Sequence, residues 1–134
     1  MESENVYRFY KDTLCENAIE TALKIKEGVL AKKRFQLHKY EVACSDISDD
    51  HKCIMLCFER YSFNKSNYVG STVLIKESDF KIDITVYNSG GSFVSSYDYL
   101  YDRVFEVIQN LGFKLKPRPK DDDTSIDPSI KELL

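Results

Sequence analysis

The sequence lacks an apolar run that could cross a membrane, because no stretch approaches the ~18 residues that a spanning helix requires. Its first residues, Met1 to Asn5, are acidic and lack the basic and apolar regions of a signal peptide. Basic residues are not in excess either, since 19 Lys and Arg stand against 22 Asp and Glu, which gives a formal net charge of -3. We therefore expect a cytoplasmic protein with no membrane partner, and its net charge disfavours nucleic acid as a partner.

Paired cysteine spacing is also lacking. No CxxC motif occurs, so in a chain without an export signal we expect reduced, buried thiols and no disulfides. Zinc is disfavoured because Cys53 and Cys57 lie four residues apart on a predicted strand, about 13 Å at ~3.3 Å per residue, whereas its sulfur ligands lie within about 4 Å of one another. We predict no metal and no other cofactor. The residues weighed as metal ligands were Cys44, His51, Cys53 and Cys57.

The 134 residues, 43% of them apolar, suffice for one core, and the periodicity of the apolar positions assigns its elements. Thr13 followed by Glu16 predicts a helix start, because the two side chains satisfy free amide donors. Gly112 ends a second helix and lets Phe113 fold back on it. The two apolar stripes are Cys15, Ala18, Ile19, Ala22, Leu23 and Ile25 in the first helix, and Leu100, Val104, Val107, Ile108 and Leu111 in the second.

Strands are expected before the first helix and between the two helices. The run 53–58 is apolar at both parities, which predicts the middle strand of the sheet, covered on both faces. A phase change near His38 predicts a bulge. In the clearest alternating strand, the inward residues are predicted to be Phe80, Ile82, Ile84 and Val86. The expected strands cover 5–11, the region from Arg34 to Cys44, 53–58, 68–77 and 80–86.

This element order, β-α-β-β-β-β-α, predicts an α+β fold. It is a two-layer sandwich in which a mostly antiparallel sheet of four to five strands carries both helices on one face. The domain is expected to span 1–113. A flexible tail, 114–134, is expected to follow, because a basic, proline-bearing block and then an acidic block replace the apolar pattern.

Two short motifs make up the candidate ligand site. Glu59, Arg60, Tyr61 and Ser62 end a strand, where alternation places Arg60 on the face opposite Glu59. The turn Ser89, Gly90, Gly91 and Ser92 lies shortly before the second helix, where free amides and the helix dipole can hold an anion. If the sheet brings them together, they frame a polar cleft; the structural alternative is a sheet-edge ion pair and a plain strand-to-helix connection.

With these motifs in place, the chain resembles a family of short uncharacterised bacterial proteins, a domain of unknown function. Its members carry a similar ERYS strand end, further strands, an SGGS-like turn and a closing helix. The resemblance covers roughly Lys52 to Gly112, while the opening strand and helix agree only in pattern. It implies a compact cytoplasmic α+β domain and brings no activity with it. The charged tail after Phe113 departs from the shorter members.

Three functions are left open by the sequence. The absence of a matched acid, base and nucleophile favours a non-catalytic interaction module with no catalytic residues, which binds a protein partner or a second copy of itself. Tyrosines support an interface, because their rings are enriched there, and the candidates are Tyr61, Tyr87, Tyr97, Tyr99 and Tyr101. A small-molecule or anion sensor or enzyme that uses the polar cleft is the alternative. Nucleic-acid binding, the third, rests on a basic edge made of Lys32, Lys33, Arg34, His38 and Lys39.

Overall fold

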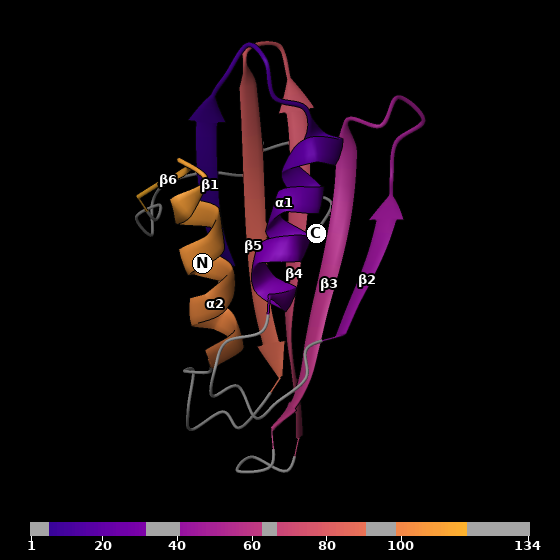
Figure 1. Ribbon diagram of the computed structural model, residues 1–134, viewed down its shortest axis with the longest axis vertical. Coiled ribbons are helices and arrows are strands. Elements are labelled where there is room, and N and C mark those ends of the chain that lie inside the picture. Colours follow the sequence, from indigo (N-terminus) through magenta and orange to yellow (C-terminus); the bar gives the residue numbers. More distant parts are fainter. Residues whose placement is uncertain (1–5, 32–40, 63–66, 91–98, 118–134) are drawn as a thin grey trace, which may run out of the picture.

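The structure, a computed structural model, describes residues 6–31, 41–62, 67–90 and 99–117. Two helices and six strands form within these ranges (Figure 1). In chain order they are β1 (Val6–Asp12), α1 (Ala18–Leu30), β2 (Glu41–Asp46), β3 (Cys53–Ser62), β4 (Asn67–Ser78), β5 (Lys81–Gly90), α2 (Tyr99–Asn110) and β6 (Lys114–Leu115).

The strands make a single antiparallel sheet in the order β2-β3-β4-β5-β1-β6. Both helices lie on the same face of this sheet, in front of it in Figure 1. The predicted α+β two-layer fold is therefore confirmed, with one strand more than expected. The prediction that 53–58 forms the middle of the sheet is wrong, because β3 is second from the β2 edge and β4 and β5 take the centre.

Alternation along the strands decides which side chains face the helices. On β5, Ile82, Ile84 and Val86 are buried as predicted, and their partners in register on β4 include Ile75 and Val73. Each such side chain contributes about 1.5–3 kcal/mol when it is fully removed from water. The inner-face strand residues of the core are Phe9, Ile54, Leu56, Phe58, Val69, Val73, Ile75, Ile82, Ile84 and Val86.

Phe80 does not belong to that inward set, contrary to the prediction. It lies in the two-residue turn between β4 and β5, with a φ of 66° and 68% of its surface exposed. The hairpin register pairs Ser78 with Lys81, so the paired part of β5 begins after Phe80. The alternating apolar pattern of β5 includes Phe80 in the sequence, but this residue lies outside the paired strands. Its carbonyl accepts a hydrogen bond from the Thr13 amide at 2.9 Å, which ties the turn to the segment after β1.

Helix α1 begins later than predicted. Asn17 is its N-cap, and the Asn17 Oδ1 accepts a hydrogen bond from the Glu20 amide at 2.8 Å. Thr13 instead caps the preceding turn, where its hydroxyl accepts from the amides of Cys15 and Glu16. The predicted stripe is correspondingly wrong at three positions. Cys15, Ile19 and Leu23 are exposed, and the buried positions of the helix are Ala18, Thr21, Ala22, Ile25 and Val29.

The two helices contact each other closely at Gly28. A Cβ placed there would lie 2.7 Å from Cγ1 of Val107 on α2, which is closer than carbon atoms pack. Arg103 of α2 reaches the same end of α1, where its Nη2 donates to the Gly28 carbonyl at 2.6 Å. The guanidinium thus supplies a positive charge to a helix end that has no basic residue of its own in its last turn.

The end of α2 agrees with its prediction. Gly112 has a φ of 96°, a left-handed conformation that other residues rarely adopt, and Phe113 beyond it is buried at 4% exposure. The chain then continues into β6, which pairs with Phe9 and Tyr10 of β1. Lys114 and Leu115, placed in the tail by the sequence, are therefore part of the sheet, and residues 118–134 lie outside the described part of the structure.

Candidate functional site

The two predicted motifs approach the same end of the sheet. In the register, Val69 of β4 has Arg60 as its partner on β3 and Gly90 as its partner on β5. Arg60 and Gly90 are thus two strand spacings apart, about 10 Å at ~4.8 Å per spacing. Gly91 and Ser92 lie outside the described residues, so the structure places only the first half of the turn motif near Arg60.

The alternation predicted for the strand end of β3 holds at its first two residues. Glu59 is exposed on the helix-free face, whereas Arg60 is buried at 5% exposure on the helix-covered face. Tyr61 and Ser62 continue the strand and pair with Tyr68 and Asn67. Arg60 places a buried guanidinium at the edge of an apolar layer. It is the residue of this motif with the strongest capacity for ionic and hydrogen-bond interactions.

Other polar groups near Arg60 are bonded within the fold. The Ser71 hydroxyl, buried on β4, donates to Oδ1 of Asn88 on β5 at 2.8 Å. The Tyr101 hydroxyl donates to the Ser89 carbonyl at 2.9 Å, which fixes α2 against the end of β5. Arg60 is engaged in an interaction as well. The bonds of Ser71 and Tyr101 thus join β4 to β5 and α2 to β5 next to Arg60.

The remaining sequence candidates are distributed more widely. Tyr87 is 47% exposed on the helix-free face, and Tyr101 is half-buried by its hydrogen bond to β5. Tyr97 and the basic edge over Lys32 to Lys39 lie outside the described residues. The predicted bulge near His38 falls in the same segment. Neither the predicted basic edge nor Tyr97 can therefore be assigned to a surface of the fold.

The cysteines are less buried than predicted. Cys15 and Cys44 are exposed, and Cys53 and Cys57 are half-buried on the helix-free face; all four are free thiols. The prediction failed because Cys53 and Cys57 lie on the helix-free face, Cys15 lies in the turn before α1, and Cys44 lies on the edge strand beyond α1. Cys44 has inward parity on β2, opposite to Cys53 and Cys57. Within the described ranges, no group of three or more His, Cys, Asp or Glu is placed to hold a metal ion.

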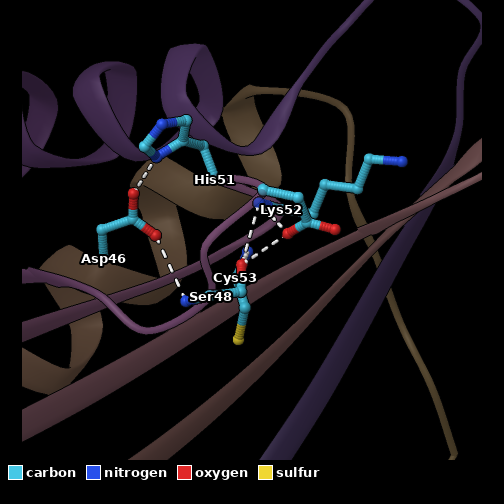
Figure 2. A network of polar contacts seen from close by, with 6 residues as sticks. Asp46, Ser48, His51, Lys52 and Cys53 are labelled. Atoms are coloured by element: carbon cyan, nitrogen blue, oxygen red, sulfur yellow. Dashed lines mark hydrogen bonds and ion pairs between the residues drawn. The ribbon is translucent and has the colours of Figure 1, made fainter.

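A hydrogen-bonded turn joins β2 to β3 (Figure 2). The Ser48 hydroxyl donates to Oδ1 of Asp50 at 2.8 Å and accepts from the Cys53 amide at 3.0 Å. His51, which has a φ of 60°, contacts the Asp46 carboxylate through its Nδ1. These bonds hold the loop and fix where β2 ends.

Two pKa values in this turn depart from their ordinary range. The hydrogen bond to Asp46, helped by the charge of that carboxylate, raises the pKa of His51 above 6.5. The hydrogen bond from the Ser48 hydroxyl, followed by the one from the Lys52 amide, lowers the pKa of Asp50 below 3.8. Asp50 is therefore ionised at neutral pH, and the turn carries fixed negative charge next to the outer strand.

Strand β2 extends beyond the helix layer. Cys44 and Asp46 have the same parity as Leu56 and Ile54, their register partners on β3, yet they are exposed while those partners are buried. Figure 1 shows the reason, since β2 lies at the edge of the sheet beyond α1. Among the described residues, no strand pairs with its outer edge.

The direction of the β2 amides follows from one hydrogen bond. The amide of Ile47, next after the strand, donates to the Cys53 carbonyl of β3 at 2.9 Å. Successive amides of a strand point to opposite sides, so Ala43 and Ser45 also face β3. The amides and carbonyls of Val42, Cys44 and Asp46 consequently face the free edge. Sequence analysis missed these outward-facing backbone groups, because strand order in the sheet is not a local property.

Native edge strands usually carry protection against pairing, through lysine, proline or a bulge. β2 contains no lysine, proline or bulge: its sequence is Glu-Val-Ala-Cys-Ser-Asp, and its register with β3 is unbroken from Glu41 to Asp46. Its protection is limited to its short length and to the charge of Asp46, which has the same parity as the buried Ile54. The opposite edge of the sheet differs, because the short strand β6 covers part of β1 and carries lysines on both sides of Leu115. Among the described residues, β2 is therefore the longer edge strand whose outer side no other strand covers.

Comparison of this chain with protein-family models, with curated proteins and with solved structures finds no match in any of the three. In the part of the chain that the structure describes, neither helix is long and apolar enough to cross a membrane.

Proposed function

We propose that this protein is a non-catalytic interaction module that binds an extended segment of a partner protein along the free edge of β2. The observation that supports the proposal is the set of backbone groups of Val42, Cys44 and Asp46, which face away from β3 on an edge strand that has no lysine, proline or bulge. A partner segment that pairs there satisfies these groups and adds a strand to the sheet. Main-chain hydrogen bonds supply the affinity in this mode of recognition.

A substitution at Cys44 tests the outward-facing backbone groups of β2 without removing the hydrogen bonds between β2 and β3. Cys44→Pro removes an amide that faces outward, and it leaves the amides of Ala43 and Ser45 bonded to β3. Cys44→Ala keeps the outward amide and serves as the matched control. Both variants are expected to unfold at nearly the denaturant concentration of the wild-type protein, because Cys44 is exposed and its amide does not bond to β3.

The experiment selects binders from a displayed library of random 12-residue peptides on immobilised wild-type protein. The selected peptides are then measured against Cys44→Pro and Cys44→Ala. We expect binding to wild type and Cys44→Ala, and loss of at least about tenfold with Cys44→Pro, since each lost hydrogen bond and the clash of the ring weaken pairing. Peptides that bind Cys44→Pro as tightly as wild type would show that β2 is not the site.

A second candidate is a polar or anionic ligand held at the Arg60 end of the sheet, as a sensor or enzyme site. It is supported by the register that brings Arg60 and Gly90 to either side of Val69. Thermal unfolding with a panel of phosphate, sulfate and carboxylate compounds tests it. A concentration-dependent rise in midpoint that disappears in Arg60→Gln favours this function, and no shift across the panel at millimolar concentration removes it.

We also propose that the protein is cytoplasmic and belongs to the bacterial family that its strand-end and turn motifs resemble. The support is four cysteines without paired spacing, which are free thiols in the structure, and the two motifs at Glu59 and Ser89. Fractionation of cells that express the full-length protein tests the location. Recovery in the membrane or secreted fraction contradicts it.

A further inference from the structure

The outward-facing groups of β2 are spaced so that two copies of the strand can satisfy each other. Val42, Cys44 and Asp46 each direct an amide and a carbonyl away from β3. When a two-fold axis passes through Cys44, Val42 of one copy pairs with Asp46 of the other, and Cys44 pairs with its own counterpart. Any shift of this antiparallel register leaves at least one of the three residues without a partner from the set.

The side chains of β2 permit such a close approach. Ala43 and Ser45 are small and exposed on the helix-free face, and in this register they lie opposite each other in the two copies. Cys44 is exposed and lies opposite its counterpart on the other face. No bulky side chain of these three positions therefore separates the two strands.

Asp46 faces a valine of the other copy in this pairing, so the two Asp46 carboxylates do not lie opposite each other. Within its own chain, the Asp46 carboxylate accepts a hydrogen bond from the Ser48 amide at 3.3 Å and contacts Nδ1 of His51 (Figure 2). Its polar atoms are thus bonded inside one protomer. The pairing does not need a cation from the second copy at this position.

The two ends of β2 differ in charge. The turn after the strand carries Asp49 and Asp50 against Lys52, whereas the residues that precede the strand in the sequence, 32–40, include no acidic residue. The basic residues among them are Lys32, Lys33, Arg34 and Lys39. Antiparallel pairing brings the end of β2 in one copy beside the beginning of β2 in the other. The acidic end of each strand is therefore matched with the basic end of its partner, which favours a second copy as the occupant.

The helix layer leaves room for this pairing. Helix α1 packs over β3 and β4, and β2 extends beyond it (Figure 1). A two-fold axis perpendicular to the sheet keeps the helices of both copies on one face. The two α1 axes are then four strand spacings apart, about 19 Å at ~4.8 Å per spacing, which is well beyond the ~8–10 Å at which helices pack.

We infer that the segment recognised by β2 is β2 of a second copy of this chain, so that two sheets join into one across a two-fold axis at Cys44. This inference rests on the proposed function and names its partner. Pairing along so short a strand makes a small interface, which is typical of weak, reversible association. We therefore expect a dimer that dissociates at micromolar concentration.

Sedimentation velocity of the full chain from ~1 to ~100 µM measures this association. Wild type and Cys44→Ala are expected to change from monomer to dimer across the range. Cys44→Pro removes two outward amides from the interface, because the residue occurs in both strands, and should raise the dissociation constant at least about tenfold. The amides of Val42, Cys44 and Asp46 should exchange rapidly in the monomer and become protected as the dimer forms.

Oxidation of Cys44 locates the interface. Its two Cα atoms lie about 5.5 Å apart in the inferred register, within the roughly 4.4–6.8 Å that a disulfide spans. With diamide as the oxidant, which takes up the two protons and two electrons of the thiols, Cys15→Ser/Cys53→Ser/Cys57→Ser is expected to give a covalent dimer. The control Cys44→Ser/Cys53→Ser/Cys57→Ser keeps only Cys15, which is also exposed, and is expected to stay monomeric.

The outcomes separate this inference from the proposed function. A dimer that is lost in Cys44→Pro and is linked through Cys44 supports both. A chain that stays monomeric at the highest concentration, or a dimer that Cys44→Pro leaves intact, overturns the inference. The peptide selection then decides the proposed function by itself, because peptides that depend on Cys44 leave strand addition in place and a selection without such peptides removes it as well.

Discussion

At the residue scale, Phe80 is held in a conformation that its side chain disfavours. A non-glycine residue in the left-handed region costs roughly 1–2 kcal/mol, and an exposed ring recovers little of that cost by packing. Phe80→Gly is therefore expected to raise the free energy of unfolding by about 0.5–1 kcal/mol, after the extra entropy of glycine in the unfolded chain is subtracted. Urea titration followed by circular dichroism measures the change.

Phe80→Ala is the control for that substitution, because it removes the ring and keeps the Cβ. It is expected to be no more stable than the wild-type protein. Equal stabilisation by Ala and Gly would mean that the backbone conformation at the turn carries no cost. The same variants also show whether the exposed ring has a role in binding. If the strained conformation is kept for function, replacing Phe80 should weaken binding.

His51 provides a pH-dependent prediction. Since Asp46 raises its pKa in the folded protein, the contribution of this contact to stability is complete below pH 6.5 and disappears as the pH rises through the higher, folded pKa. A nuclear magnetic resonance titration of the His51 ring should show a midpoint above 6.5. In Asp46→Asn the midpoint is expected to fall toward 6.5, and an unchanged midpoint would contradict the assigned contact.

At the element scale, the crossing of α1 and α2 depends on the missing side chain of Gly28. Gly28→Ala gains about 1 kcal/mol of helix propensity, but overpacking against the stiff Val107 side chain costs about 1–3 kcal/mol. We expect a net loss of stability of about 1 kcal/mol. The double variant Gly28→Ala/Val107→Ala is the test of the cause.

In that double variant, the added methyl group occupies the space that the valine leaves. The effect of Gly28→Ala measured on the Val107→Ala background is expected to change sign and become stabilising. If Gly28→Ala is equally destabilising with and without Val107, the close contact is not the reason for the glycine.

Properties that repeat along a single element could be predicted from the sequence. Ile82, Ile84 and Val86 face inward as expected, because a strand alternates its side chains wherever it lies in the sheet. The prediction fails at Phe80, where the alternating pattern continues past the end of the ladder. It also fails at Cys15, which lies before the observed start of α1. Thr13 and Asn17 can both cap a helix, and in the structure Asn17 is the N-cap while Thr13 caps the preceding turn.

Strand order could not be predicted in the same way. The position of β3 near the edge follows from the pairing of β5 with β1, and that choice depends on contacts between distant parts of the chain. For the same reason the sequence identified Arg60 and Gly90 as polar candidates but not the free backbone of β2. A local pattern shows which residues are exposed on a strand, and only the complete sheet shows which strand lacks a neighbour.

At the scale of the whole molecule, the sheet predicts a gradient of local stability. β4 and β5 have a strand on each side and the helices above them, whereas β2 lies at one edge beyond the helix layer. Native-state hydrogen exchange should therefore find the slowest amides in β4 and β5, with protection near the global free energy of unfolding. Within β2, the amides of Val42, Cys44 and Asp46 should exchange fastest, and equal protection along β2 would contradict the free edge.

The position of β1 has a consequence for synthesis of the protein on the ribosome. β1 is made early, yet its neighbours β5 and β6 both come from the second half of the chain. At ~5–20 residues per second, β1 waits several seconds with both of its edges unsatisfied while the intervening strands emerge. During this interval we expect the aromatic residues of β1 to stay exposed on the nascent chain, where unpaired strand edges favour aggregation.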